Sequence, residues 1–518
     1  MNLHTSFTTP ATRARSRSRW PAAIVVALLT LQWPPHAIAG TGAQTDADAA
    51  AVAPTGPGIA QPTPPAAAPV AVASSTDAYA EFRRRFDAGQ YVEAVDYARS
   101  VAELTERQVT DPTAEDLQVA LMNLGMVQNL AEDYSGAEAT FQRVIGLIEK
   151  SGRPARARLA RAYAGLASAY HDGKRYELAV QAFDQAIALT RRHEGLLTEQ
   201  QVPLIEKYVD SLTELGRYPE ALQAQKYLLR IATRQYGETS VDIVPRLEQI
   251  GRWYASVGAY DQSRRILKQA LEIVVTAEGG QSQRLVSPLL ALAACNRRQL
   301  LDPVQQQQDS ADEAAARFND ATAAMAMSSY SPGMLIAEGE RALLQAAALT
   351  DALTAPPPMQ VLNVRTQLGD WYQLRMQPDR ALPHYRQAWQ AATRITEKTA
   401  GKTYTEAIFG KPVLLHVVRP DGWNRYAGRA PDTLEVRNVV VEFAVDPTGR
   451  VQDTKVVDDS GDAKRAERTA RALVETGRYR PRLEAGEAVA TQEMRFDQPW
   501  ILPLPEPAPA PAAPGNRS

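Results

Sequence analysis

The stretch LASAYHDGKRYELAVQAFDQA, residues 166–186, contains the pattern that decides the fold. A large and a small apolar residue precede a polar turn, and Tyr176 follows the turn directly. A small residue, Ala179, comes three positions later, and Phe183 follows at the spacing of the next helical turn. Apolar residues three and four positions apart lie on one face of a helix. We therefore predict two helices joined by the turn, with Ala179 allowing them to cross closely.

The same pattern recurs along the chain. The turn segments AGQYVEA, AEDYSGA, DGKRYELA, LGRYPEA and VGAYDQS each place a small residue three positions after a tyrosine. The tyrosines are Tyr91, Tyr134, Tyr176, Tyr218 and Tyr260, with spacings of 43, 42, 42 and 42, and the small residues are Ala94, Ala137, Ala179, Ala221 and Ser263. Self-similarity at a fixed period is the sequence signature of a repeat array.

These residues resemble the tetratricopeptide repeat (TPR), which has a large–small pair, an aromatic residue, a small alanine and a phenylalanine at set offsets. A period near 42 resembles the longer version found in kinesin light chains. The resemblance covers residues 77 to about 280, and QLGDWYQLRMQPDRALPHYRQAW, residues 367–389, resembles a further copy. We interpret the irregular stretch between them as a degenerate or lengthened pair of repeats. The prediction is a mainly α protein with a TPR solenoid over residues 77–400.

The resemblance also implies a binding surface, because stacked helix pairs form a curved array whose inner face binds partners. In the family's register, this concave face receives seven residues. They are Met126, Asn129, Ser168, His171, Asp210, Thr213 and Arg252. The alternative is that each is an ordinary solvated helix residue.

The C-terminal region has a different period. In VEFAVDPTGRVQDTKVV, residues 441–457, apolar and polar residues alternate on both sides of the turn Asp446-Pro447-Thr448-Gly449, as expected for a β-hairpin. An amphipathic helix is predicted over residues 462–476, and a last strand over residues 491–498. We therefore predict a small α+β domain of ββαβ order.

This order resembles the C-terminal domain of TonB-like proteins. The matching residues are Val445-Asp446, Gly449-Arg450-Val451, Ala470, Tyr479, Pro481, Gly486, Val489 and Phe496. We assign residues 411–500 to this domain. In the family, such domains bind outer-membrane receptors by pairing a receptor peptide with a sheet edge. We expect the unpaired edge at Thr491–Phe496. The candidate binding residues are Tyr479, Pro481, Thr491, Glu493, Arg495 and Phe496.

The N-terminus resembles an export signal. Four arginines lie in residues 13–19, a short apolar run occupies residues 21–33, and an A-x-A site ends at Ala39. Thirteen helical residues reach about 20 Å, against a hydrocarbon core of about 30 Å. We predict a signal peptide over residues 1–39 and a periplasmic protein. The alternative is an uncleaved inner-membrane anchor facing the periplasm. Residues 40–76 are an Ala/Pro-rich linker and residues 501–518 a Pro-rich tail, both expected to be disordered.

The sequence offers no recognisable catalytic constellation. The six histidines are scattered, Cys295 is the only cysteine, and no phosphate-binding loop or nucleophile elbow occurs. The net charge of −2 gives no basic surface for nucleic acid. We expect no cofactor and no metal, and membrane contact only through an uncleaved N-terminus. The predicted function is a non-catalytic adaptor for envelope proteins, such as an outer-membrane receptor. One alternative is a TonB-type energy transducer with an uncleaved anchor, and a hydrolase without a recognised motif is a third hypothesis.

Overall fold

The fold is taken from a computed structural model that describes residues 74–152, 155–302, 330–397, 399, 402–417, 434–459 and 464–503. The predicted signal peptide, most of the linker and residues 504–518 lie outside the described residues. Ser75 and Thr76, which we assigned to the linker, instead belong to the first helix, α2 (Ser75–Asp87).

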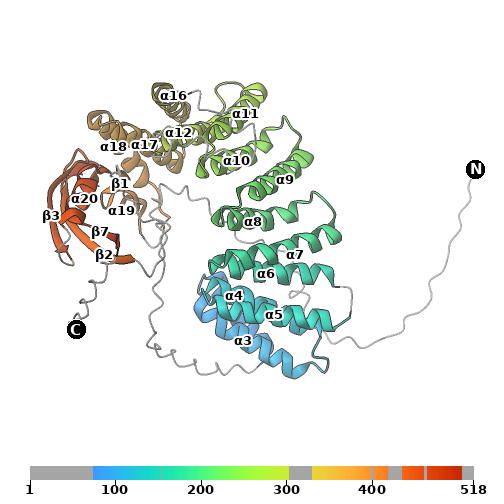
Figure 1. The fold of residues 1–518 in the computed structure, drawn as a ribbon. Coiled ribbons are helices and arrows are strands. Elements are labelled where there is room, and N and C mark those ends of the chain that lie inside the picture. The colour runs from blue at the N-terminus through green and yellow to red at the C-terminus, as the bar shows by residue number, and fades with distance from the viewer. Residues whose placement is uncertain are drawn as a thin grey trace, which may run out of the picture. The chain divides into compact units, whose positions relative to one another are not determined.

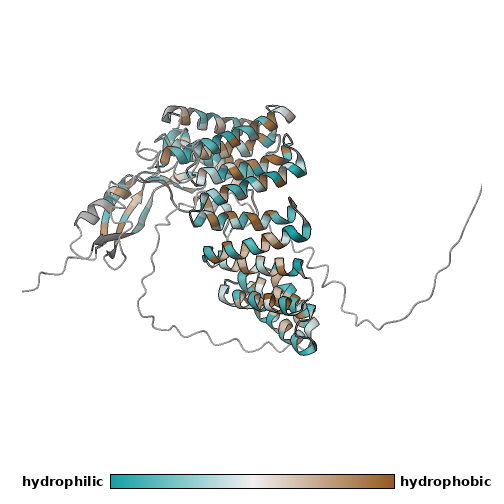
Figure 2. Cartoon of the chain, turned by 45° about the vertical axis from the view of Figure 1, so that its right-hand side comes forward, coloured by the Kyte–Doolittle hydropathy of each residue, from teal (hydrophilic) through white to brown (hydrophobic). Residues whose placement is uncertain are grey.

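Helix pairs stack one after another over most of the described chain (Figure 1). After α2 and α3 (Tyr91–Gln108) come α4 (Glu115–Leu130) with α5 (Tyr134–Lys150), α6 (Arg156–Asp172) with α7 (Tyr176–Glu194), α8 (Val202–Glu214) with α9 (Tyr218–Tyr236), and α10 (Val244–Ser256) with α11 (Tyr260–Glu278). Single 3-10 turns, η1 (Glu199–Gln201), η2 (Val241–Ile243) and η3 (Gln283–Leu285), precede α8, α10 and α12 (Val286–Leu301). The helices in view carry both apolar and hydrophilic residues (Figure 2).

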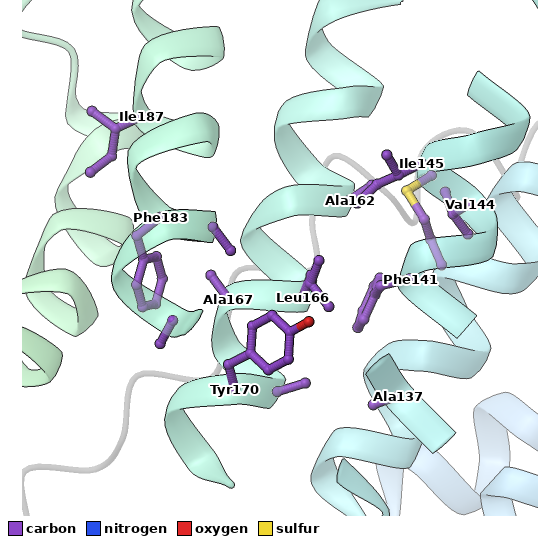
Figure 3. Close-up of a cluster of buried hydrophobic side chains, with 14 of the residues drawn as sticks. Ala137, Phe141, Val144, Ile145, Ala162, Leu166, Ala167, Tyr170, Phe183 and Ile187 are labelled. Atoms are coloured by element: carbon purple, nitrogen blue, oxygen red, sulfur yellow. The ribbon is translucent and has the colours of Figure 1, made fainter. Parts of the chain in front are cut away.

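The packing explains why the sequence repeats. Each of the five tyrosines is the first residue of the second helix of its pair. The small residue three positions later is fully buried in all five pairs. In the last of them, the Ser263 hydroxyl donates to the Gly251 carbonyl at 2.7 Å, so the polar group at this crossing is satisfied. Figure 3 shows Phe141 next to Leu166, where α5 meets α6. The predicted mainly helical repeat array is confirmed.

The irregular stretch contributes one helix pair to the described residues. Helix α12 packs against α16 (Pro332–Asp351), and residues 303–329, which separate them, lie outside the described residues. The last pair is α17 (Pro358–Leu374) with α18 (Pro378–Ala392). Here Pro378 begins the second helix in place of tyrosine, and Ala381 is again buried three positions later.

The C-terminal region is a small mixed structure, as predicted. It comprises α19 (Tyr404–Phe409), β1 (Val413–His416), β2 (Leu434–Val445), β3 (Val451–Asp459), α20 (Lys464–Glu475), β4 (Arg478–Arg480), β5 (Arg482–Glu484), β6 (Glu487–Val489) and β7 (Thr491–Pro503). The main sheet has the antiparallel order β3-β2-β7, and α20 packs against it.

Two details differ from the sequence prediction. The short strands β1, β4, β5 and β6 form the separate ladders β1–β4 and β5–β6 in addition to the ββαβ order. Strands of three or four residues are too short to show a period of two. In addition, β7 continues to Pro503, so residues 501–503 belong to the sheet rather than to the tail.

Candidate partner-binding surfaces

Polar side chains connect the first helices of successive repeats. On α4, Asn129 Nδ2 donates to Asp172 Oδ2 of α6 at 2.7 Å. The same carboxylate pairs with Lys207 Nζ of α8 at 3.2 Å. We call the face formed by the first helices α4, α6, α8 and α10 the first-helix face. The two contacts join side chains that are 43 and 35 residues apart, so polar groups of neighbouring first helices meet across these junctions.

Two more of the predicted residues take part in such contacts. His171 Nδ1 lies 2.8 Å from Ser211 Oγ, and Trp253 Nε1 donates to Thr213 Oγ1 at 2.9 Å. Burial and the nearby Lys207 ammonium lower the pKa of His171, so the ring is favoured in its neutral form. These side chains bind one another across repeats.

The other predicted residues of this face differ in exposure. Ser168 is buried, and Met126 is half-buried against the apolar core. Asp210 and Arg252 are exposed. Arg252 pairs with the buried Glu248 at 3.1 Å. The pKa of Asp210 is raised to about 6, because its carboxylate is partly desolvated and lies near the carboxylates of Glu206 and Glu214. Part of the side chain is still in contact with solvent. The structure therefore brings the seven residues onto neighbouring helices but leaves two of them exposed.

Strand β7 lies at one edge of the main sheet. Its partner there is β2, with Val441 opposite Phe496 and Glu442 opposite Arg495. At the other side of β2, the Asp446 N–H donates to the Arg450 carbonyl at the start of the β3 hairpin. Main-chain groups of successive strand residues point to alternate sides, so Val441 and Phe443 direct theirs toward β7. It follows that Arg495, opposite Glu442, directs its N–H away from the sheet.

The predicted edge residues have distinct environments. Thr491 pairs with Val445, and between this pair and Phe443 the register shifts by one residue. Glu493 lies in that bulge with φ of 56° and is exposed. Arg495 Nη2 pairs with Glu442 Oε1 at 2.8 Å across the strands. Phe496 packs against the apolar core of the sheet. The structure therefore places these residues along the edge strand and gives Phe496 a packing role.

Two family matches cover the repeats and the sheet. The family described as "Tetratricopeptide repeat" matches residues 116–192 and 203–274. The family described as "Gram-negative bacterial TonB protein C-terminal" matches residues 429–497. The chain carries tetratricopeptide repeats followed by a TonB C-terminal domain. Repeats of this kind bind proteins, and no catalytic family matches the chain.

The structural neighbours are distant. BtubC (BKLC) from P. vanneervenii is 16% identical, with 53% of this chain and 94% of that chain covered and a TM-score of 0.33. A putative kinesin light chain with nearly identical TPR-like repeats from Podosopora anserina is 15% identical, with 39% and 96% covered and a TM-score of 0.35. The C-terminal part of a TPR repeat-containing protein from Cytophaga hutchinsonii is 11% identical, with 61% of this chain and 96% of that part covered and a TM-score of 0.35. No curated protein matches the sequence. Scores this low carry no argument about function.

The remaining two predicted residues of the TonB C-terminal domain are buried. Tyr479 belongs to the core of the sheet, where its ring centroid lies 5.7 Å from that of Phe443, and burial raises its pKa to about 12. Its N–H donates to the Gly449 carbonyl at 3.0 Å. Pro481 is buried as well. Their burial indicates that they stabilise the domain. Direct contact of Tyr479 and Pro481 with a partner stays a prediction, which their burial does not favour.

Sequence reasoning missed a buried charged group between the repeats and the TonB C-terminal domain. Arg480, the middle residue of the Tyr-x-Pro motif, pairs with Asp370 of α17, and the Tyr385 hydroxyl donates to the same carboxylate at 3.0 Å. Two signals could have indicated it. Asp370 directly follows the large–small pair of the last repeat, and Tyr385 occupies the position of the repeat phenylalanine.

In the described part of the chain, no helix is both long and apolar enough to cross a membrane. Within the same residues, no three His, Cys, Asp or Glu side chains are grouped so that they could hold a metal ion.

Proposed function

We propose that this protein is a non-catalytic periplasmic adaptor. Its repeats hold one protein on the first-helix face, and its TonB C-terminal domain contacts an envelope component such as an outer-membrane receptor. The observation that carries the proposal is the outer edge of β7. An edge strand with outward main-chain N–H and C=O groups is a template for one more strand from another protein.

The arrangement of charges supports two separate binding surfaces. On the first-helix face, exposed Asp210 and Arg252 offer one acidic and one basic group, which suits a peptide of mixed charge. On β7, the exposed Arg495 side chain forms an ion pair with Glu442, so the two charges offset each other. The groups that bind a partner at this edge are therefore the main-chain N–H and C=O groups. Affinity there comes from the strand pairing, and selectivity comes from side chains.

The test of the edge uses a proline, which lacks the N–H that pairing requires. Glu493 is unsuitable, because its φ of 56° cannot be adopted by proline. Arg495→Pro removes an outward N–H, and Arg495→Gln is the matched control because both variants lose the ion pair with Glu442. The full-length chain is immobilised and exposed to a detergent extract of Gram-negative outer membranes, and circular dichroism checks that each variant is folded.

We expect the proline variant to lose the captured membrane protein and the glutamine variant to retain it. Equal capture by both variants would refute docking at this edge. N-terminal sequencing of the mature protein then separates the adaptor from its alternative. A chain beginning near Gly40 supports export and cleavage, whereas an intact N-terminus in the membrane fraction supports the anchored energy transducer.

A further inference from the structure

A buried ion pair lies in the contact between the last helix pair and the strands that follow it. Arg480 of β4 donates from Nε to Asp370 Oδ1 at 2.9 Å and from Nη2 to Asp370 Oδ2 at 2.8 Å. Asp370 is 3% exposed and Arg480 is 5% exposed. Two parallel hydrogen bonds of this kind fix both the distance and the orientation of the partners.

Surrounding elements contact both members of the pair. Arg480 Nη1 donates to the Ile408 carbonyl of α19 at 3.2 Å, and the Tyr385 hydroxyl of α18 donates to Asp370. Burial by itself would lower the pKa of Arg480, but the Asp370 carboxylate raises it above its ordinary value. Removing one partner of a buried pair leaves an uncompensated charge, which is strongly unfavourable.

A second contact joins the β2–β3 turn to the end of α17. Gln373 Nε2 donates to the Thr448 carbonyl at 2.6 Å. The next residue, Gly449, has φ of 75°, and a Cβ there would lie 2.0 Å from the Tyr479 carbonyl oxygen and 2.2 Å from Gln373 Nε2. The turn therefore fits against the helix only with glycine at this position.

A third contact is apolar. Leu483 of β5 is 5% exposed and belongs to the same core cluster as Ala388 and Ala391 of α18. Phe409 of α19 is fully buried in this cluster, with its ring 6.3 Å from that of Tyr385. The last pair of a repeat array has no following repeat to cover its apolar side. Here α19 and β5 cover it.

We propose that α19 and the TonB C-terminal domain together form the C-terminal cap of the repeat array, held in place by the Asp370–Arg480 pair. In this arrangement the domain is a structural continuation of α17 and α18, and the two unfold together. The inference does not depend on the proposed partners, because it concerns contacts within one chain.

The test measures amide hydrogen exchange in the full-length chain. Asp370→Asn leaves the Arg480 guanidinium buried without its counter-charge. We expect exchange to accelerate by about a hundredfold in α17, α18 and β4–β6 together, since loss of a buried partner destabilises strongly and a cooperative unit opens as one. Acceleration confined to α17 and α18, with β4–β6 unchanged, would overturn the proposal.

A second variant keeps the test decisive if Asp370→Asn does not fold. Gly449→Ala adds a methyl group against Gln373 and Tyr479, and Gly216→Ala is the matched control. Gly216 also has a positive φ, of 69°, but an added Cβ there meets nothing within 4 Å. We expect Gly449→Ala to accelerate exchange about tenfold more than its control in both α17 and β4, because only it combines backbone strain with overpacking. Equal acceleration by both substitutions, or an effect of Gly449→Ala that spares α17, would show that the domain is a separate module.

Discussion

The ring of Phe141 offers a sharp test of the repeat packing, because it lies between two glycines of neighbouring helices. A Cβ added at Gly165 of α6 would lie 2.3 Å from Phe141 Cε1 and Cζ, and one added at Gly125 of α4 would lie 3.0 Å from the opposite edge of the ring. A ring displaced away from Gly165 would therefore move toward the backbone of α4 at Gly125. Gly146 of α5 provides the control, because an added Cβ there meets nothing within 4 Å.

Gly146→Ala and Gly165→Ala both remove a helical glycine, but only Gly165→Ala adds a methyl group to a packed site. Replacing a glycine inside a helix stabilises the protein by about 0.5–1 kcal/mol. An extra methyl group in a packed site costs about 1–3 kcal/mol. We therefore expect Gly146→Ala to raise the free energy of unfolding by about 0.5–1 kcal/mol. Gly165→Ala should lie about 1–3 kcal/mol below Gly146→Ala, since only this substitution meets the ring.

The assay is urea unfolding of the full-length chain followed by circular dichroism, with the midpoint and slope fitted for each variant. The slope must stay constant for the comparison to hold. If Gly165→Ala stabilises the protein as much as Gly146→Ala does, Phe141 does not fill the space between α4 and α6. The register assigned to the large–small pair and the phenylalanine would then be wrong.

Two further predictions concern stability. Ala179→Leu should lower the free energy of unfolding by about 1–3 kcal/mol, because Ala179 is fully buried at the crossing of α6 and α7; an unchanged urea midpoint would contradict the close crossing. Burial and the nearby guanidinium groups lower the pKa of His384 from its ordinary 6.5 to about 4. Between these two pH values the unfolded chain binds more protons than the folded chain. The free energy of unfolding therefore falls as the pH drops from 6.5 to 4, by at most about 1.4 kcal/mol per pH unit. His384→Gln should flatten this dependence in urea titrations at several pH values, and the same change at exposed His193 should not; equal pH profiles for both variants would contradict the assignment.

The repeats could be predicted because their information is local and recurs. A tyrosine, a small residue and an aromatic residue each have a packing role within a few helical turns, and the period near 42 repeats the evidence. The pairing of Asp370 with Arg480 had no such support, because 110 residues separate its members. A single aspartate in a helix and a single arginine in a short strand are each compatible with a solvated surface.

The first-helix face shows a subtler limit. Its residues could be assigned to one side of the helices from the repeat register alone. Their bonding to one another could not, because the contact between His171 and Ser211 depends on which rotamers meet across a junction. Exposed positions such as Asp210 are therefore the better candidates for partner contact. The paired positions instead stabilise the contact between neighbouring repeats.

The prolines of β7 indicate where along this strand a partner can pair. The register places Pro499 opposite Asn438 and Pro503 opposite Leu434. Both are at positions whose main-chain groups point away from β2, by the same alternation that directs the Arg495 N–H outward. This is the side of an edge strand on which proline is tolerated, since no ladder hydrogen bond is lost. The two prolines therefore remove two outward N–H donors from the C-terminal half of β7.

At the N-terminal end of β7, the bulge at Glu493 interrupts the regular pairing. A continuous set of outward N–H groups is therefore left at Arg495 and Asp497, so a docking strand should be centred on this short stretch and pair only weakly beyond Pro499.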